Sequence, residues 1–185
     1  MLIGKKILTY GEIDSTNDEA KRLIKAGAHE GTVIIAESQK SGRGKPGSQW
    51  FSPKAQGLYL SVILKPLKDP QKLDPLVLLG AKAAVEAIKE TCRLKAEIKE
   101  PNDIMISGKK IGGVLVERVD TSSDIPSVII GVGLNLNIDR FPDELKNKAA
   151  SLKTFKKASI DIKGFTSALL KALDQGYLKF LKGGV

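Results

Sequence analysis

Apolar residues follow two spacings along this chain, and the spacing separates predicted strands from predicted helices. Short apolar or alternating runs between turn residues predict β-strands, here at residues 5–13, 31–38, 57–65, 95–103 and 127–138. Apolar residues that recur every three or four positions predict amphipathic helices, here at residues 18–27, 74–92, 141–149 and 161–181. Strands and helices mix without strict alternation, which predicts an α+β fold with a mixed β-sheet packed against helices.

Local signals mark where several of these elements begin, turn and end. Ser15, followed three residues later by Asp18, resembles a capping box at the start of the first helix, and Gly27 is typical of a helix end. Residues 104–119 have the pattern of a β-hairpin with Gly108 in its turn. In the last helix one apolar stripe predicts the face that packs on the core; it consists of Ile162, Phe165, Leu169, Leu173, Tyr177 and Phe180.

The composition is that of one globular domain. The chain has 185 residues, of which 42% are apolar and 28% charged. It shows no apolar run of membrane-spanning length and no signal-peptide layout, and the single cysteine, Cys92, cannot form an internal disulfide. We therefore expect one cytoplasmic domain over residues 1–185, without a membrane partner.

The chain is basic, with a formal net charge of +9 from 30 basic and 21 acidic residues. Such a balance suits an anionic partner, or it reflects a lysine-rich solubilising surface. A basic nucleic-acid-binding module is one alternative. However, aromatic residues make up only 5% of the chain, and the cations are not gathered in one recognition helix. We therefore expect no nucleic-acid partner.

The stretch at residues 39–56 has no apolar periodicity and is predicted to be a loop. Its core is Gly42, Arg43, Gly44 and Lys45, where glycines allow backbone N–H groups to approach an anion and the cations neutralise it. The stretch is neither a Walker A loop nor a dinucleotide-binding fingerprint, so an anion-binding loop and a solvated surface loop both remain open. Trp50 follows it, either as a core anchor or as a platform that stacks on a ring.

A second group of polar residues surrounds the predicted hairpin. Asn102 and Asp103 follow Pro101, and Asp103 is either a Mg²⁺ ligand or a turn former. Lys110 lies seven residues further on, across the hairpin, so that it and Asp103 could face one cleft. Gly112 and Gly113 permit close approach of a ligand or of another backbone segment.

Two more polar segments, Ser15–Thr16–Asn17 and the strand end at Asn135, are either structural or part of a site. His29 is the only histidine and is typical of a turn residue. A histidine-dependent triad or a histidine metal site is therefore not expected.

Taken in order, these segments resemble the catalytic domain of the biotin protein ligases, and the resemblance covers most of the chain. The matching stretches are DSTN, GRGKPGSQW, KEPND, KIGGVLVE and GVGLN, which begin at residues 14, 42, 99, 110 and 131. Each is weak alone, but five in the family's order are specific. The resemblance implies the biotin/lipoate ligase catalytic fold, which is similar to that of class II aminoacyl-tRNA synthetases.

The resemblance also implies an ATP-dependent ligase that forms biotinyl-5′-AMP and transfers biotin to a lysine of a biotin carboxyl carrier domain. ATP and Mg²⁺ would be required, and a homodimer is compatible with it. The alternatives are a lipoate or octanoate ligase or transferase of the same fold, and a biotin-binding protein with impaired catalysis.

Roles for single residues follow from the same resemblance. Lys110 and Arg43 would be catalytic, and Asp103 would lie near the metal. The biotin-binding residues would be Ser15, Thr16, Asn17, Gln39, Gly42, Arg43, Lys110 and Gly113. The nucleotide-binding residues would be Lys45, Trp50, Asn102 and Asn135.

The chain departs from the family pattern at several positions. Glu100 replaces a tryptophan on a strand face that it would share with Ala96 and Ile98, where a buried carboxylate is costly. Lys45 and Ser48 replace basic residues of the loop, so we expect weaker retention of the adenylate. We further expect neither an N-terminal DNA-binding domain nor the small C-terminal β-barrel that family members usually carry.

Overall fold

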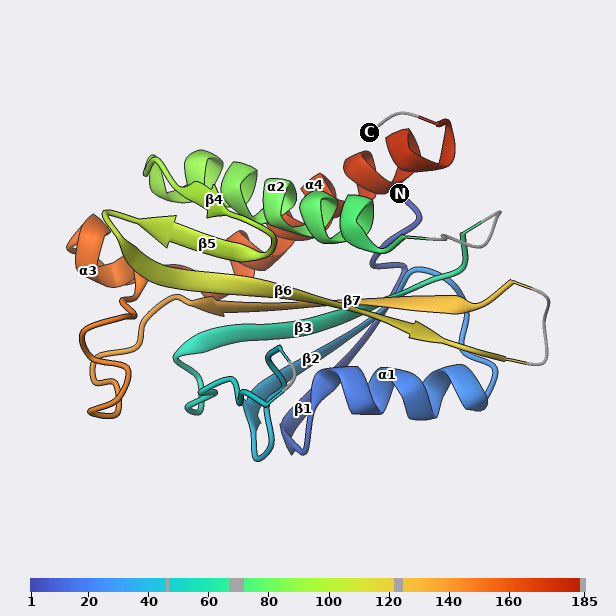
Figure 1. The fold of residues 1–185 in the computed structure, drawn as a ribbon, viewed down its shortest axis with the longest axis horizontal. Helices are drawn as coiled ribbons and strands as arrows, with labels where there is room; N and C mark the ends of the chain where they lie inside the picture. Colours follow the sequence, from blue (N-terminus) through green and yellow to red (C-terminus); the bar gives the residue numbers. More distant parts are fainter. Residues whose placement is uncertain (46, 67–71, 122–124, 184–185) are drawn as a thin grey trace.

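In the computed structural model, seven strands form one mixed sheet with helices on both faces (Figure 1). The structure describes residues 1–45, 47–66, 72–121 and 125–183. The strands are β1 (Lys6–Ile13), β2 (Thr32–Gln39), β3 (Gly57–Leu64), β4 (Glu97–Lys99), β5 (Asp103–Ile106), β6 (Lys109–Val119) and β7 (Ser127–Asn135). The helices are α1 (Thr16–Lys25), α2 (Asp74–Cys92), α3 (Leu152–Lys156) and α4 (Ile162–Leu181).

The strands lie in the order β1-β2-β3-β7-β6-β5-β4. Only β1 and β2 pair in parallel, and α1 is the crossover between them; all other neighbours are antiparallel. A parallel pair needs such a crossover, whereas antiparallel neighbours can follow each other through short turns. The α+β fold with a mixed sheet is therefore confirmed.

The two faces of the sheet are covered unequally. Leu58, Leu60 and Val62 of β3 point to the face under α2 and α4, where they join the larger core. The other face carries α1, whose Ala20 and Ile24 pack in a smaller apolar cluster. Because α1 is short, it covers only one end of this face, and the remainder holds the polar residues described below.

Elements with strong periodicity match the sequence prediction. The four middle residues of the α4 stripe are fully buried, and Ile162 and Phe180 at its ends are partly buried against the same core. In the β5–β6 hairpin, Ser107 and Gly108 both have positive φ, 48° and 74°. Two positive φ angles in succession are typical of a type I′ turn, whose twist suits a hairpin.

The prediction of a helix at residues 141–149 is wrong. Pro142 accepts from the amides of Leu145 and Lys146, and Leu145 accepts from those of Lys148 and Ala149, so the segment forms two successive turns but no continuous helix. The main chain of Lys110 then pairs with this segment, donating to the carbonyl of Lys148 and accepting from the amide of Ala150. That pairing extends the chain along β6, and the helix α3 begins only afterwards.

Two smaller predictions also differ. The strand expected at 127–138 ends at Asn135. Ser15 is the N-cap of α1, as expected, but its side chain makes no capping hydrogen bond, so the capping box is not formed. Its hydroxyl is buried instead, at the edge of the site. Within the described residues, no helix is long and apolar enough to cross a membrane.

Candidate functional site

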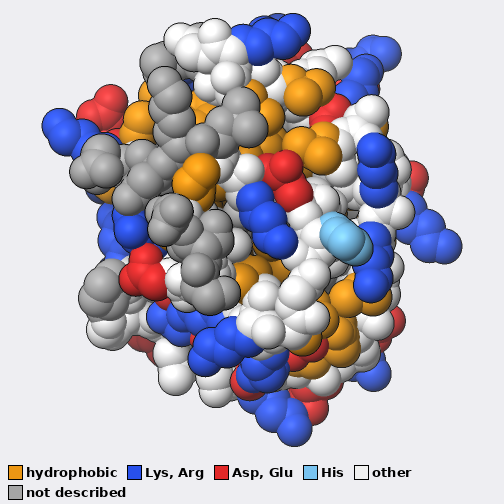
Figure 2. All heavy atoms as spheres, turned by 90° about the vertical axis from the view of Figure 1, so that its right-hand side faces the viewer, with side chains coloured by type: hydrophobic (Ala, Val, Ile, Leu, Met, Phe, Trp, Pro, Cys, Tyr) orange, Lys and Arg blue, Asp and Glu red, His pale blue; other side chains and the backbone are white. Residues whose placement is uncertain are grey.

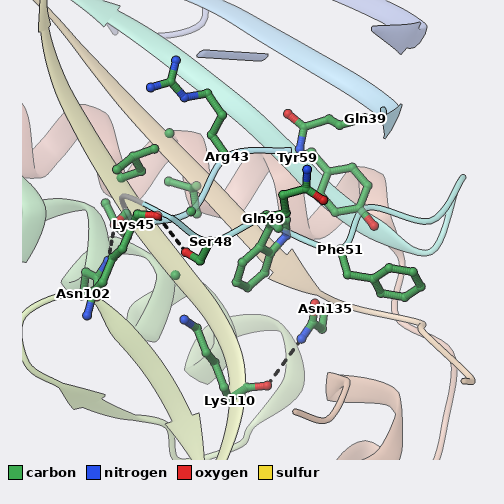
Figure 3. A pocket seen from close by; sticks show the side chains of 18 of the residues that line it. Gln39, Arg43, Lys45, Ser48, Gln49, Phe51, Tyr59, Asn102, Lys110 and Asn135 are labelled. Atoms are coloured by element: carbon green, nitrogen blue, oxygen red, sulfur yellow. Dashed lines mark hydrogen bonds between the residues drawn. The ribbon is translucent and has the colours of Figure 1, made fainter. Parts of the chain in front are cut away.

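A cavity of about 280 Å³ lies on the part of the sheet that α1 leaves uncovered (Figure 3). This volume is near the lower end of small-molecule sites. The cavity gathers side chains from the start of α1, the loop after β2, the hairpin and the end of β7. Every residue predicted for the site except Gly42 lines it: Ser15, Thr16, Asn17, Gln39, Arg43, Lys45, Trp50, Asn102, Asp103, Lys110, Gly113 and Asn135.

One end of the cavity is built from a buried hydrogen-bond network. Gln39 accepts from the amide of Thr16 at 2.8 Å, which orients its carboxamide across the start of α1. Ser61 of β3 lies 2.8 Å from the Thr16 hydroxyl. Ser15 is fully buried, and its hydroxyl has no partner among the described residues. A buried polar atom without a partner is costly, so a ligand that bonds to Ser15 gains from relieving that cost.

Asn17 lines the cavity, and both ends of its side-chain amide group are held by this network. Its amide group donates to Glu117 at 2.7 Å, and its carbonyl oxygen lies 2.5 Å from the Ser61 hydroxyl. A Cβ at Gly131 would lie 2.3 Å from that same carbonyl oxygen. The first glycine of GVGLN therefore makes room for Asn17 against β7.

The loop after β2 folds back on itself at the cavity mouth. Gly42 accepts from the amide of Trp50 at 2.8 Å, and Gly44 donates to the carbonyl of Ser48 at 3.1 Å. A Cβ at Gly42 would lie 2.5 Å from the Trp50 carbonyl oxygen, so only glycine fits there. Gly42 thus lies behind the cavity wall and fixes the shape of the loop.

The Trp50 indole packs against the backbone of Gly133 and Gly113 in the cavity. A Cβ at Gly133 would come within 2.6 Å of the indole, and one at Gly113 would lie 3.6 Å from it. The Lys110 ammonium is 5.4 Å from the ring centroid, a distance at which cation–π attraction operates. The indole N–H is buried without a partner in the described structure. Trp50 therefore both anchors the loop and presents a ring inside the cavity.

Lys110 and Asp103 meet across the hairpin, as the sequence suggested. The Lys110 ammonium nitrogen lies 2.7 Å from an oxygen of Asp103. This contact is an ion pair without hydrogen-bond alignment, because that oxygen has no hydrogen-bond partner. The Asn135 amide donates to the main-chain carbonyls of Lys110 and Ala150, at 3.4 and 3.2 Å, and so fixes the backbone beneath the lysine (Figure 3).

Asn102 holds the end of the hairpin beside this pair. Its amide donates to the Val114 carbonyl at 2.9 Å, while its own side-chain oxygen is buried without a partner among the described residues. That oxygen is a second acceptor, besides the Ser15 hydroxyl, that a bound molecule can satisfy.

Arg43 is paired with carboxylates in this structure. Its guanidinium donates to Asp18 at 2.6 Å and to Glu117 at 2.8 Å. Burial alone would lower the pKa of Arg43, but the hydrogen bond to Asp18 and the charge of Glu117 raise it, so the group stays charged. A direct catalytic contact by Arg43 remains a prediction.

Asp103 is the only carboxylate among the residues that line the cavity. In the part of the chain that the structure describes, no group of three or more His, Cys, Asp or Glu could hold a metal. A Mg²⁺ ion here would therefore take at most one protein carboxylate and complete its shell with phosphate and water oxygens, as Mg²⁺ commonly does.

Glu100 is placed differently from the expectation. Strand β4 ends at Lys99, and Glu100 lies in the following turn with its side chain exposed. It does not share a buried face with Ala96 and Ile98, so no desolvation cost arises, and it does not line the cavity.

Several residues of the site were missed by sequence reasoning. Tyr59 and Ser61 face the cavity side of β3, and Glu117 closes the network from β6. Burial raises the pKa of the Tyr59 phenol, which stays neutral and donates to the Pro53 carbonyl. One feature of the sequence could have indicated Ser61: it is a polar residue in the middle of the apolar run GLYLSVIL.

Comparisons with known proteins agree with this geometry. Residues 11–135 match the biotin/lipoate A/B protein ligase family. Over 99% of its length the chain is 37% identical to the bifunctional ligase/repressor BirA of Bacillus spizizenii, of which it spans 57%.

Solved structures are similar as well. A biotin protein ligase from Aquifex aeolicus in complex with biotin and ATP shares 31% identity, with a TM-score of 0.86 over 97% of this chain and 73% of that one. A biotin protein ligase from Leishmania major in complex with biotinyl-5-AMP shares 27% identity, with a TM-score of 0.78 over 98% of this chain and 76% of that one.

Proposed function

The chain belongs to the biotin/lipoate A/B protein ligase family, and we propose that it joins biotin to ATP and passes the activated biotin to a lysine of a carrier protein. The observation that carries the proposal is the single cavity in which the loop at Gly42, the start of α1, the hairpin and the end of β7 converge. The A. aeolicus relative binds biotin and ATP, which supports the same two ligands here.

In the first half-reaction, a carboxylate oxygen of biotin bonds to the α-phosphorus of ATP. The bond from that phosphorus to its bridging oxygen breaks, and pyrophosphate leaves. In the second half, the amine of an acceptor lysine bonds to the biotinyl carbonyl carbon, the bond to AMP breaks, and the amine gives up a proton. Neither half needs a side-chain nucleophile, and the cavity lining contains neither cysteine nor histidine.

The main obstacle is repulsion between two anions. Each pair of unit charges at 4 Å costs about 4 kcal/mol at an effective dielectric of 20. Lys110 and Lys45, both in the lining, supply positive charge that offsets this cost and stabilises charge on the phosphate as it develops. Asp103 holds the Lys110 ammonium at a defined position before the substrates arrive.

We assign the ureido ring of biotin to the end of the cavity near Ser15, Thr16 and Gln39, where a free hydroxyl is already buried. The nucleotide then lies toward Trp50, Asn102 and Asn135. Mg²⁺ bound to the ATP phosphates would neutralise part of their charge, with Asp103 as its protein ligand. The proposed acceptor is a biotin carboxyl carrier domain.

Acid-dependent exchange between ATP and pyrophosphate tests the proposal. We expect exchange with biotin, and none above background with lipoate, octanoate or no acid. Exchange with lipoate or octanoate alone would instead identify a lipoate-type ligase. Calorimetric binding of biotin without any exchange would identify a biotin-binding protein.

A further inference from the structure

Glu117 of β6 accepts from two residues of α1 and from the loop after β2. The amide of Asn17 donates to it at 2.7 Å, Lys21 of α1 at 2.9 Å and Arg43 of the loop at 2.8 Å. Its side chain is 16% exposed, so solvent screens these contacts only in part. A carboxylate shared in this way joins the helix, the loop and the sheet at one point.

The cluster around Glu117 is electrically balanced. Asp18 and Glu117 face Lys21 and Arg43, and Arg43 bridges the two carboxylates at 2.6 and 2.8 Å. Hydrogen bonds between charged partners are about twice as strong as neutral ones. If Arg43 moved to a phosphate, the partly buried carboxylates of Asp18 and Glu117 would keep only Lys21 as a cationic partner among the described residues.

The position of Arg43 determines the position of the loop. Arg43 follows Gly42, whose carbonyl accepts from Trp50, and Arg43 itself forms a β-bridge with Gln49. The carboxylates that bind the Arg43 guanidinium therefore also fix the two loop segments that Arg43 and Gln49 join beside the cavity. In Figure 3 the Arg43 side chain extends away from Lys110 and Asn135, out of the region where those residues meet.

We propose that Glu117 is a positioning residue: with Asp18, it binds Arg43 and thereby anchors the loop segments 42–45 and 47–50 at the cavity. Arg43 is then a structural tether of the loop, and the charge on the reacting phosphate is met by other cations. The inference rests on the proposed function only for its effect on the adenylate; the anchoring itself does not depend on the substrate.

Glu117→Gln tests the anchor, because glutamine keeps an acceptor for Asn17 but removes the charge that binds Arg43. Hydrogen–deuterium exchange, without substrates, should show the Gly44 and Trp50 amides exchanging at least tenfold faster. Biotinyl-AMP should dissociate at least fivefold faster, while kcat for its formation stays within threefold. Arg43→Gln should speed the exchange of the same two amides, and the amides of the double variant should exchange no faster than those of either single variant.

Lys21→Gln is the matched control, because it removes a partner of Glu117 on the helix without touching the loop. We expect less than a twofold change in loop exchange. Asp18→Asn gives the same test at the more exposed carboxylate should Glu117→Gln fail to fold.

Unchanged loop exchange in Glu117→Gln would overturn the proposal. So would a large loss of kcat in Arg43→Gln that Glu117→Gln does not share, because Arg43 would then act on the reactants directly. Absence of biotin-dependent activity in the unaltered protein would reject the proposed function but leave the exchange experiment on the loop intact.

Discussion

Gly131 and Gly133 alternate with Val132 and Leu134 along β7, so that at these positions one face of the strand joins the core and the other carries no side chain. The bare face is where Asn17 and Trp50 lie against the backbone. Glycine weakens a strand, and its presence there indicates a close approach that a Cβ would prevent. At the residue scale, the glycines shape the cavity and the polar residues supply its chemistry.

Gly131→Ala tests this role. The new Cβ would lie 2.3 Å from the Asn17 carbonyl oxygen and force that side chain off Ser61. We expect biotin affinity, measured by calorimetry, to fall at least tenfold, or about 1.4 kcal/mol. Gly11→Ala on β1 is the control, because its Cβ meets nothing within 4 Å. Equal affinity in both variants would show that Asn17 does not shape the biotin end.

Lys45 and Ser48 test the chemistry of the loop. Ser48 donates to the Lys45 carbonyl, and both residues line the cavity. Arginine at both positions would add bidentate donors for a phosphate. We expect biotinyl-AMP to dissociate at least threefold more slowly from the double variant, as measured by chase with unlabelled biotin. A dissociation rate that does not fall would mean that these positions do not contact the adenylate.

The sequence predicted which residues meet in the cavity but not what holds them there. Short motifs contain Ser15, Lys110 and Asn135, which line the cavity, and their roles remain predictions. The partners of Asn17 and Arg43 were not predictable from local sequence, because Ser61 and Glu117 lie far away along the chain and meet them only once the sheet is formed.

At the scale of elements, the spacing of apolar residues predicted correctly those segments whose structure follows from their local sequence. Helix α4 and the β5–β6 hairpin follow from apolar spacing and a glycine turn alone. The helix predicted at residues 141–149 does not form, because main-chain hydrogen bonds between Lys110 and the segment at 148–150 override the local helical preference. These bonds are tertiary contacts, which the local pattern does not predict. The same contact places Asn135 under Lys110.

The N-terminal segment is attached to α4 by Asp174. This buried carboxylate accepts from the amides of Leu2 and Ile3 at 2.6 and 2.8 Å, and Ile3 is 1% exposed. Asp174→Ala leaves both amides without that acceptor, and we expect a loss of about 2–4 kcal/mol in the free energy of unfolding. Asp174→Asn, which keeps an acceptor, should lose less.

Urea unfolding followed by circular dichroism measures both variants. Gln175→Ala, at the exposed neighbouring position, is the control and should stay within about 0.5 kcal/mol of the unaltered protein. A loss no larger in Asp174→Ala than in this control would mean that the segment does not depend on Asp174.

At the scale of the whole molecule, the larger core and the cavity lie on opposite faces of the sheet. The face under α2 and α4 holds the larger core, and the face that α1 leaves open holds the cavity. On the side shown in Figure 2, Lys and Arg are interspersed with acidic and apolar side chains rather than gathered in one stripe. Inside the cavity, Lys45 and Lys110 bring positive charge into the lining.

Biotin-dependent exchange between ATP and pyrophosphate, measured for the unaltered protein and for Lys110→Ala, tests the central claim most directly. Lys110 is the cation that Asp103, Trp50 and Asn135 together hold in the cavity. We predict exchange in the unaltered protein and a loss of at least tenfold in the variant, about 1.4 kcal/mol of transition-state stabilisation. An unchanged rate in Lys110→Ala would contradict the account.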